Sequence, residues 1–201
     1  IGGRNLVRNG NFSNSTSTSG YWNNWGSPSI REFVTLNGKK WCHIKGTGTA
    51  QYQGINQNTG IRIEKDTQYT ISIRVKGAKD NQIFAIGVHW NSTSTIIAQS
   101  WKYPTVGTTD KIVTATFRTP NTDVNHFNLM LGVSSTTTVY EVYFTDIKLE
   151  KGNKATDWTP APEDVDSSIT NLESNTKTLS TQYTSLNQTL TSLSATVNSN
   201  T

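Results

Sequence analysis

The chain has 201 residues, of which 33% are hydrophobic and only 16% charged, and it contains six Trp and a single Cys. It has no run of 18 apolar residues and no signal-peptide pattern, so the sequence predicts neither a membrane span nor membrane targeting. One Cys excludes an internal disulfide and any Cys-based zinc site. Because the chain starts at Ile1 without a Met and ends at Thr201 in mid-pattern, we expect a fragment of a longer protein.

The charge is distributed unevenly along the chain. Residues 1–158 carry 17 Lys and Arg against 10 Asp and Glu, whereas residues 159–201 carry one against four. A positive body favours an anionic partner, such as a phosphate-bearing cell-wall polymer, through long-range attraction. Ordinary solvated surface charge is the alternative. The basic residues are not concentrated as in a nucleic-acid-binding protein, so no nucleic-acid partner is predicted.

Residues 4–150 have the period-2 pattern of half-buried strands. Apolar side chains alternate with polar ones from Tyr69 to Lys76, and the alternation recurs within 84–90, 113–117, 127–133 and 142–149. Turn signals such as Asn37-Gly38 and Pro120-Asn121 separate these runs. Many short strands without helical periods between them predict an all-β antiparallel sandwich, and we favour a jelly roll.

A different period begins after Pro160 and Pro162. Apolar residues follow alternating steps of four and three, which predicts an α-helical coiled coil over 165–201. The a positions are Ile169, Thr176, Tyr183, Leu190 and Val197, and the d positions are Val165, Leu172, Leu179, Leu186 and Leu193. Asp164 or the Pro-Glu-Asp segment caps the helix start. Nearly half of residues 166–201 are Ser or Thr, which are poor helix formers, so the helix needs partner chains. A disordered Ser/Thr linker is the alternative.

Several motifs occur in a characteristic order. They are Asn5-Leu6-Val7-Arg8-Asn9-Gly10-Asn11-Phe12, Tyr21-Trp22, Trp25-Gly26, Gln51-Tyr52-Gln53-Gly54-Ile55, Tyr69-Thr70-Ile71-Ser72, Val75-Lys76-Gly77 and Val142-Tyr143-Phe144-Thr145-Asp146-Ile147-Lys148-Leu149-Glu150. Together they resemble the jelly-roll carbohydrate-binding modules that are appended to xylanases and cellulases. The resemblance covers residues 4–150.

The segment from Lys151 to Asp164 resembles the junction that ends such modules in tail and baseplate proteins of phages that infect Gram-positive bacteria. This resemblance implies a trimeric, virion-borne module that binds host cell-wall or surface polysaccharide beside other tail or baseplate proteins. The alternative is an extracellular module of a secreted polysaccharide-degrading enzyme. We therefore expect a sandwich over 1–158, a Pro-rich linker over 159–164 and a trimerising stalk over 165–201.

A sugar site needs aromatic rings for stacking and planar polar groups for hydrogen bonds to hydroxyls. Trp25, Tyr52, Trp101 and Tyr103 lie in or beside expected loops and are candidate stacking residues, and Gln51 and Gln53 flank Tyr52. Strand parity places Ala85, Gly87 and His89 on a non-core face, which we expect to be a groove floor. On the neighbouring strands we assign Arg74, Asn128, Met130, Glu141 and Tyr143 to the same face. An ordinary solvated face is the alternative.

The other Trp residues and Cys42 are interpreted as core. Trp22 and Trp158 stand at element ends and are expected to plug the core, and Trp41 and Trp90 share the parity of core positions. Cys42 is expected to be a buried, inert thiol.

One departure from the resemblance concerns calcium. In the enzyme-associated modules an acidic residue usually follows the Phe near the start and helps to hold a structural calcium, whereas here Ser13 follows Phe12. Asp146 and backbone carbonyls near Asn9 to Phe12 remain as candidate oxygen ligands for a structural calcium. The alternative is that Asp146 caps a bend in the last strand. No other cofactor is expected.

No catalytic pattern is present. A glycosidase needs two facing carboxylates, and only Glu141 is assigned to the groove face. The sequence has no Gly-x-Ser-x-Gly elbow, phosphate loop or His-Glu-x-x-His motif. The remaining alternatives to sugar binding are a structural spacer and adhesion to a protein, for which an exposed apolar patch would be expected.

Overall fold

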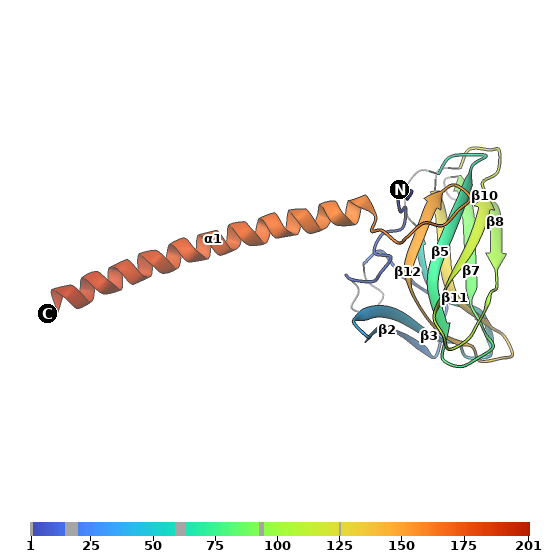
Figure 1. Ribbon diagram of the computed structural model, residues 1–201, viewed down its shortest axis with the longest axis horizontal. Coiled ribbons are helices and arrows are strands. Elements are labelled where there is room, and N and C mark those ends of the chain that lie inside the picture. The colour runs from blue at the N-terminus through green and yellow to red at the C-terminus, as the bar shows by residue number, and fades with distance from the viewer. Residues whose placement is uncertain (1, 15–19, 59–62, 93–94, 125) are drawn as a thin grey trace. The chain divides into compact units, whose positions relative to one another are not determined.

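The computed structural model describes residues 2–14, 20–58, 63–92, 95–124 and 126–201. The chain divides into two compact units, Ile1–Pro162 and Glu163–Thr201. The first is a sandwich of antiparallel sheets and the second is a single helix (Figure 1). The predicted fold class, an antiparallel β-sandwich followed by a C-terminal helix, is confirmed.

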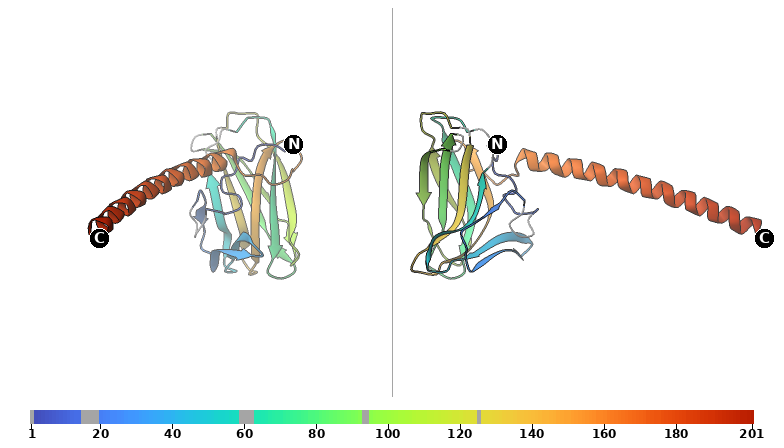
Figure 2. Two further views of the ribbon diagram at one scale, coloured as in Figure 1. Left: turned by 60° about the vertical axis from the view of Figure 1, so that its left-hand side comes forward. Right: turned by 180° about the vertical axis from the view of Figure 1, so that it is seen from behind.

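The sandwich consists of two five-stranded sheets that lie face to face (Figures 1 and 2). In spatial order, sheet A contains β1 (Asn23–Trp25), β4 (Ala50–Asn58), β11 (His126–Ser135), β7 (Ala85–Ser92) and β8 (Thr95–Lys102). Sheet B contains β10 (Lys111–Arg118), β5 (Gln68–Gly77), β12 (Glu141–Lys151), β3 (Lys39–Lys45) and β2 (Ile30–Leu36). A short pair, β6 (Gln82–Ile83) and β9 (Thr105–Val106), lies apart from both sheets.

The core is formed by the alternating apolar residues that the sequence pattern identifies. Ile71 and Ile73 of β5 and Leu129 and Leu131 of β11 are all fully buried. Each such side chain contributes about 1.5–3 kcal/mol to folding by leaving water. The predicted core burial of Trp22, Trp90 and Cys42 is confirmed, with exposed fractions between 0 and 2%. Trp41 is also buried, but it alternates with the core residues Cys42 and Ile44 along β3 and lies under the Lys76 ammonium, so its predicted core parity is wrong. Burial raises the pKa of the Cys42 thiol, which keeps the thiol protonated and unreactive.

The last strand, β12, contains a bulge at Asp146. The register with β5 shifts between Thr145 and Lys148, and Asp146 has a positive φ of 50°. The extra residue changes the parity, so Phe144 before the bulge and Ile147 after it both point into the core. The predicted bend at Asp146 is confirmed.

The boundary between the units differs from the predicted one. The expected linker over 159–164 is not a free segment, because Ala161 is fully buried and Asn5 Nδ2 donates a 2.8 Å hydrogen bond to the carbonyl of Thr159. The helix α1 (Pro162–Ser199) begins three residues earlier than predicted. Pro suits the first helical turn, where no backbone N–H is needed, and Glu163 and Asp164 suit the positive end of the helix dipole.

The Ser- and Thr-rich composition of α1 is accommodated by local hydrogen bonds. Hydroxyl groups of Thr residues donate to the carbonyl four residues earlier, at distances of 3.0–3.1 Å, for Thr170, Thr178, Thr181, Thr184, Thr189 and Thr196. These bonds satisfy the hydroxyls without partners from elsewhere. In the described part of the chain, no helix is both long enough and apolar enough to cross a membrane.

A buried polar network fastens the segment before α1 to the sandwich. Lys148, which is fully buried, donates hydrogen bonds of 2.9 Å to the Thr156 hydroxyl and to the Asp157 carbonyl. Glu150 lies 3.9 Å from the Lys148 ammonium and accepts from the Thr156 hydroxyl at 2.6 Å. The network therefore holds residues 156–157 against β12.

Replacing Lys148 tests this network. We expect Lys148→Ala to lower the free energy of unfolding by about 3–5 kcal/mol, because it leaves the buried Glu150 carboxylate without its cation. Lys151→Ala, on the same strand, is the control, since Lys151 is exposed and its pairing with Glu64 is screened by water. Urea denaturation of both variants measures the effect. Equal stability of the two variants would contradict it.

Candidate functional site

The outer face of sheet A carries side chains in cross-strand rows that follow from the strand registers. The first row is Trp25, Gly54, Gly132 and Ala85. The second is Asn23, Asn56, Met130, Gly87 and Trp101, and the third is Asn58, Asn128, His89 and Gln99. The middle of the first row therefore has almost no side chains, and the third row consists of amides and an imidazole.

An aromatic cluster, defined as Trp25, Tyr52, Trp101 and Tyr103, lies on this face. The ring centroids of Tyr52 and Trp101 are 4.2 Å apart with planes at 14°, and Trp25 lies 5.4 Å from Tyr52 and 5.6 Å from Trp101. Tyr103 is nearly parallel to Trp101 at 6.3 Å, and its hydroxyl is 2.8 Å from that of Tyr52. Tyr103 is 45% exposed, and the other three rings are partly exposed.

Gly87 allows the Trp101 ring to lie against the sheet. A Cβ atom at Gly87 would stand 2.3–2.5 Å from three ring carbons of Trp101, so any larger residue would displace the ring. The sequence pattern gave no sign of this contact, because it depends on the pairing of β7 with β8.

Arg31 stabilises the backbone that carries part of the aromatic cluster. It lies on β2 of sheet B, and its guanidinium donates hydrogen bonds to the carbonyls of Gly54, Trp25 and Gly26 at 2.7–3.0 Å. These three carbonyls belong to β4, to β1 and to the residue after β1. Arg31 therefore fixes the backbone that presents Trp25.

The side chains beside the cluster, in the third row, are polar and uncharged. Burial lowers the pKa of His89, and a hydrogen bond with Gln99 opposes this in part, so the imidazole is neutral at pH 7. The Oδ1 atom of Asn128 is buried and has no hydrogen-bond partner within the described chain. The three rows contain no Lys, Arg, Asp or Glu.

The structure brings six of the predicted site residues onto this one face. These are Trp25, Tyr52, His89, Trp101, Tyr103 and Asn128. Tyr52 lies near the start of β4 and Trp101 near the end of β8, so both are strand residues beside loops. The alternation in these two strands is weak, so the sequence did not reveal them. For the same reason Asn56, Asn58 and Gln99 were not predicted.

The two glutamines beside Tyr52 differ from each other. Gln51 is exposed on β4. Gln53 is buried, and its amide bonds to the Ser27 carbonyl, the Thr47 hydroxyl and the Thr47 N–H at 3.0–3.1 Å. Gln53 therefore positions loops and has no free polar group to offer a ligand, contrary to the prediction.

The prediction that Arg74, Glu141 and Tyr143 share a face with His89 is wrong. They lie on β5 and β12 of sheet B, whereas β7 is flanked by β11 and β8 of sheet A. Strand parity tells which residues point away from the core but does not tell in which sheet a strand lies.

The three residues take part in contacts within sheet B. Glu141 lies 2.6 Å from Nε2 of His43, whose Nδ1 is 2.8 Å from Glu32. The Tyr143 ring stacks on the His43 ring at 4.2 Å, and Arg74 contacts Asp110 at 3.4 Å. The outer face of sheet B is thus charged and internally paired at these positions.

Asp146, the predicted calcium ligand, is surrounded by cations. The Lys39 ammonium bonds to its carboxylate at 2.5 Å, and Arg74 lies 3.7 Å away. In the described part of the chain, no three His, Cys, Asp or Glu side chains gather as metal ligands would. These residues do not fit a calcium ion, which prefers six to eight oxygen ligands.

Trp158 is not a core plug. It is only partly buried, and its Nε1 donates a 3.0 Å hydrogen bond to the carbonyl of Ile147. It lines a hollow of about 600 Å³ together with Asp146 and Lys39.

Comparison with known families agrees with the fold and assigns the chain to a family. Residues 4–138 match the family model of a carbohydrate binding domain, CBM_4_9, which covers more than half of the chain. The chain belongs to this family of carbohydrate-binding modules. Such a module binds carbohydrate and is not catalytic. A search of curated proteins found no match.

Solved structures share the fold of this carbohydrate-binding module. The CBM22-1 xylan-binding domain of Paenibacillus barcinonensis Xyn10C is 14% identical, with a TM-score of 0.53, over 77% of this chain and 98% of that one. The CBM22-1-GH10 modules of Clostridium thermocellum xylanase 10B, complexed with xylohexaose, are 17% identical with a TM-score of 0.55 over 78% and 30%. Bacteriophage CBA120 tailspike protein 4 is 12% identical with a TM-score of 0.56 over 74% and 21%.

Adding a methyl group at Gly87 tests the contact between this residue and the Trp101 ring. We expect Gly87→Ala to lift the ring off the sheet and to change the near-UV circular dichroism of the stacked aromatic cluster. Overpacking of this kind costs about 1–3 kcal/mol of stability. Gly107→Ala is the matched control, because a Cβ there meets only the Asp80 side chain. An unchanged near-UV spectrum for Gly87→Ala would contradict the predicted displacement.

Proposed function

We propose that this module binds a neutral polysaccharide chain on the outer face of sheet A. The observation that carries the proposal is the aromatic cluster beside rows of uncharged hydrogen-bonding groups. Sugar rings present apolar C–H faces that pack on aromatic rings, and their hydroxyls pair with amides and imidazole. The family assignment supports carbohydrate as the ligand class.

The charge distribution favours a neutral chain over an anionic one. Sheet A offers amides and a neutral imidazole to a ligand, and it offers no cation to pair with a phosphate or carboxylate on the three rows. An anionic sugar bound there would lose water without gaining a counter-charge. The positive charge of residues 1–158 then serves solubility rather than ligand recognition.

Truncating the cluster tests the binding face. We expect Trp101→Ala and Tyr52→Ala each to weaken binding of the soluble host polysaccharide at least tenfold, or about 1.4 kcal/mol, because the stacking surface is lost. The melting temperature should change little, since both rings are partly exposed. Tyr21→Ala removes an exposed ring outside the two sheets and is the control.

Affinity electrophoresis and calorimetry measure this effect. Loss of folding in both variants would show that these rings are core rather than site. Absence of binding by the unaltered chain to every host polysaccharide would favour a structural spacer instead.

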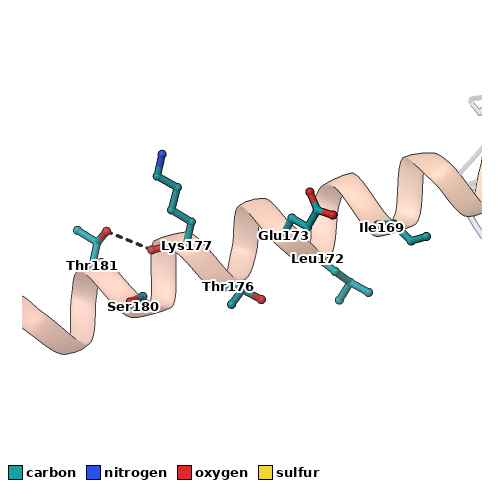
Figure 3. A pocket seen from close by; sticks show the side chains of 7 residues that line it. All are labelled: Ile169, Leu172, Glu173, Thr176, Lys177, Ser180 and Thr181. Carbon is teal, nitrogen blue, oxygen red and sulfur yellow. Dashed lines mark hydrogen bonds between the residues drawn. The ribbon is translucent and has the colours of Figure 1, made fainter.

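The second part of the proposal concerns the helix: α1 trimerises the module on a phage tail or baseplate. Its a and d side chains form a seam that is mostly exposed in the single chain, from Val165 at 42% to Tyr183 at 66%. Figure 3 shows Leu172 and Thr176 on one side of the helix and Lys177 on the other. An apolar seam with a heptad repeat is buried by packing against partner helices.

The choice of three chains rests on the resemblance of residues 151–164 to phage fibre junctions. The likeness to a tailspike protein concerns the fold alone, but it is compatible with a virion location. Three modules on one stalk would convert weak single-site affinity into strong avidity. A module attached to a secreted polysaccharide-degrading enzyme is the second candidate, favoured by the fold shared with xylanase-borne modules.

Oligomeric state separates these candidates. We expect residues 1–201 to sediment as a trimer and residues 1–162 as a folded monomer, because the sandwich is a compact unit without α1. Leu179→Asn with Leu186→Asn places polar groups in the seam and should give monomers. Thr181→Asn with Gln188→Asn, on the opposite side, should leave the trimer intact. A monomeric full-length chain at high concentration would contradict the stalk.

A further inference from the structure

The bulge in β12 places one carboxylate among several cations. The Asp146 side chain is 14% exposed, and its carboxylate contacts the Lys39 ammonium at 2.5 Å and the Arg74 guanidinium at 3.7 Å. Lys39 and Lys40 both line the hollow beside Asp146. Arg74 also contacts Asp110 at 3.4 Å, so the guanidinium is shared between two acids. A divalent cation next to Asp146 would be repelled by these positive groups.

The backbone oxygens near this carboxylate already accept hydrogen bonds. The Asn9 carbonyl accepts from the indole N–H of Trp22 at 2.9 Å and from the Phe12 N–H at 3.2 Å. The Gly10 carbonyl accepts from the Ile147 N–H at 2.9 Å. Ser13, which lines the same hollow as Asp146, contributes a neutral hydroxyl and no carboxylate. A metal ion at the Asn9 carbonyl would thus have to displace one of two existing hydrogen bonds, because a carbonyl oxygen has two lone pairs. The Gly10 carbonyl already uses one of its lone pairs.

The Lys39 ammonium connects segments that are distant in the sequence. Lys39 begins β3 directly after the turn at Asn37-Gly38, whose two residues both have positive φ and suit a type I′ hairpin turn. Asp146 belongs to the bulge of β12, 107 residues further on. The ion pair therefore ties the edge hairpin β2–β3 to the strand that pairs with both β3 and β5.

We propose that the Lys39 ammonium performs at the β12 bulge the structural role that a metal ion would have, so that the sandwich folds without calcium and has no calcium site there. The fixed cation supplies the positive charge that Asp146 needs while the carbonyls of Asn9 and Gly10 serve other contacts. This inference is independent of the proposed sugar ligand, because it concerns stability alone.

Thermal unfolding of the full chain tests the proposal. We expect the same melting temperature, to within about 1 °C, in millimolar EDTA and in millimolar calcium chloride, because an ion that does not bind the folded state cannot stabilise it. Lys39→Met should lower the melting temperature by about 2–4 °C. Lys45→Met, at the other end of β3, is the control and should change it less.

A double-mutant cycle assigns the effect to the ion pair. Lys39→Met should have little further effect in an Asp146→Asn background, because the partner is already gone. A rise of several degrees on adding calcium to the unaltered chain would overturn the proposal. So would equal melting temperatures for Lys39→Met and Lys45→Met.

Discussion

The contact between the Trp101 ring and Gly87 is the constraint on which the aromatic cluster of sheet A, the proposed binding face, depends. With no Cβ on β7 at this point, an aromatic ring from the edge strand β8 can lie across its neighbour and stack on Tyr52 of β4. The rings are thereby held in one arrangement before any ligand arrives. Such pre-organisation reduces the entropy that is lost when a ligand binds.

The two outer faces of the sandwich have different electrostatic roles. Sheet A presents aromatic rings and uncharged polar groups, whereas sheet B carries carboxylates in polar contacts, such as Glu32 and Glu141 with His43 and Asp110 with Arg74. The charged groups of sheet B bind one another and stabilise the packing of β2, β3 and β12. Under the proposed function, the amides and the imidazole of sheet A form hydrogen bonds with the ligand.

The two compact units place different demands on the sequence. The sandwich packs its core residues against one another within one chain, so the core needs no partner chain. The helix leaves Leu179 and Leu186 each 65% exposed, so its seam gains by association with other chains. The buried bonds of Lys148 and Asn5 extend the sandwich as far as the start of the helix.

The sequence by itself determined the fold class, the core and the helical seam, because alternation and heptads are local periodicities that chemistry imposes on each element. It also identified Trp25, Tyr52, Trp101 and Tyr103 as candidate stacking residues. Only the tertiary structure decided that Arg74, Glu141 and Tyr143 lie on the opposite sheet and that Gln53 is buried. Which strands become neighbours is fixed by long-range pairing, so the membership of a face and the partner of Asp146 cannot be obtained from the local pattern.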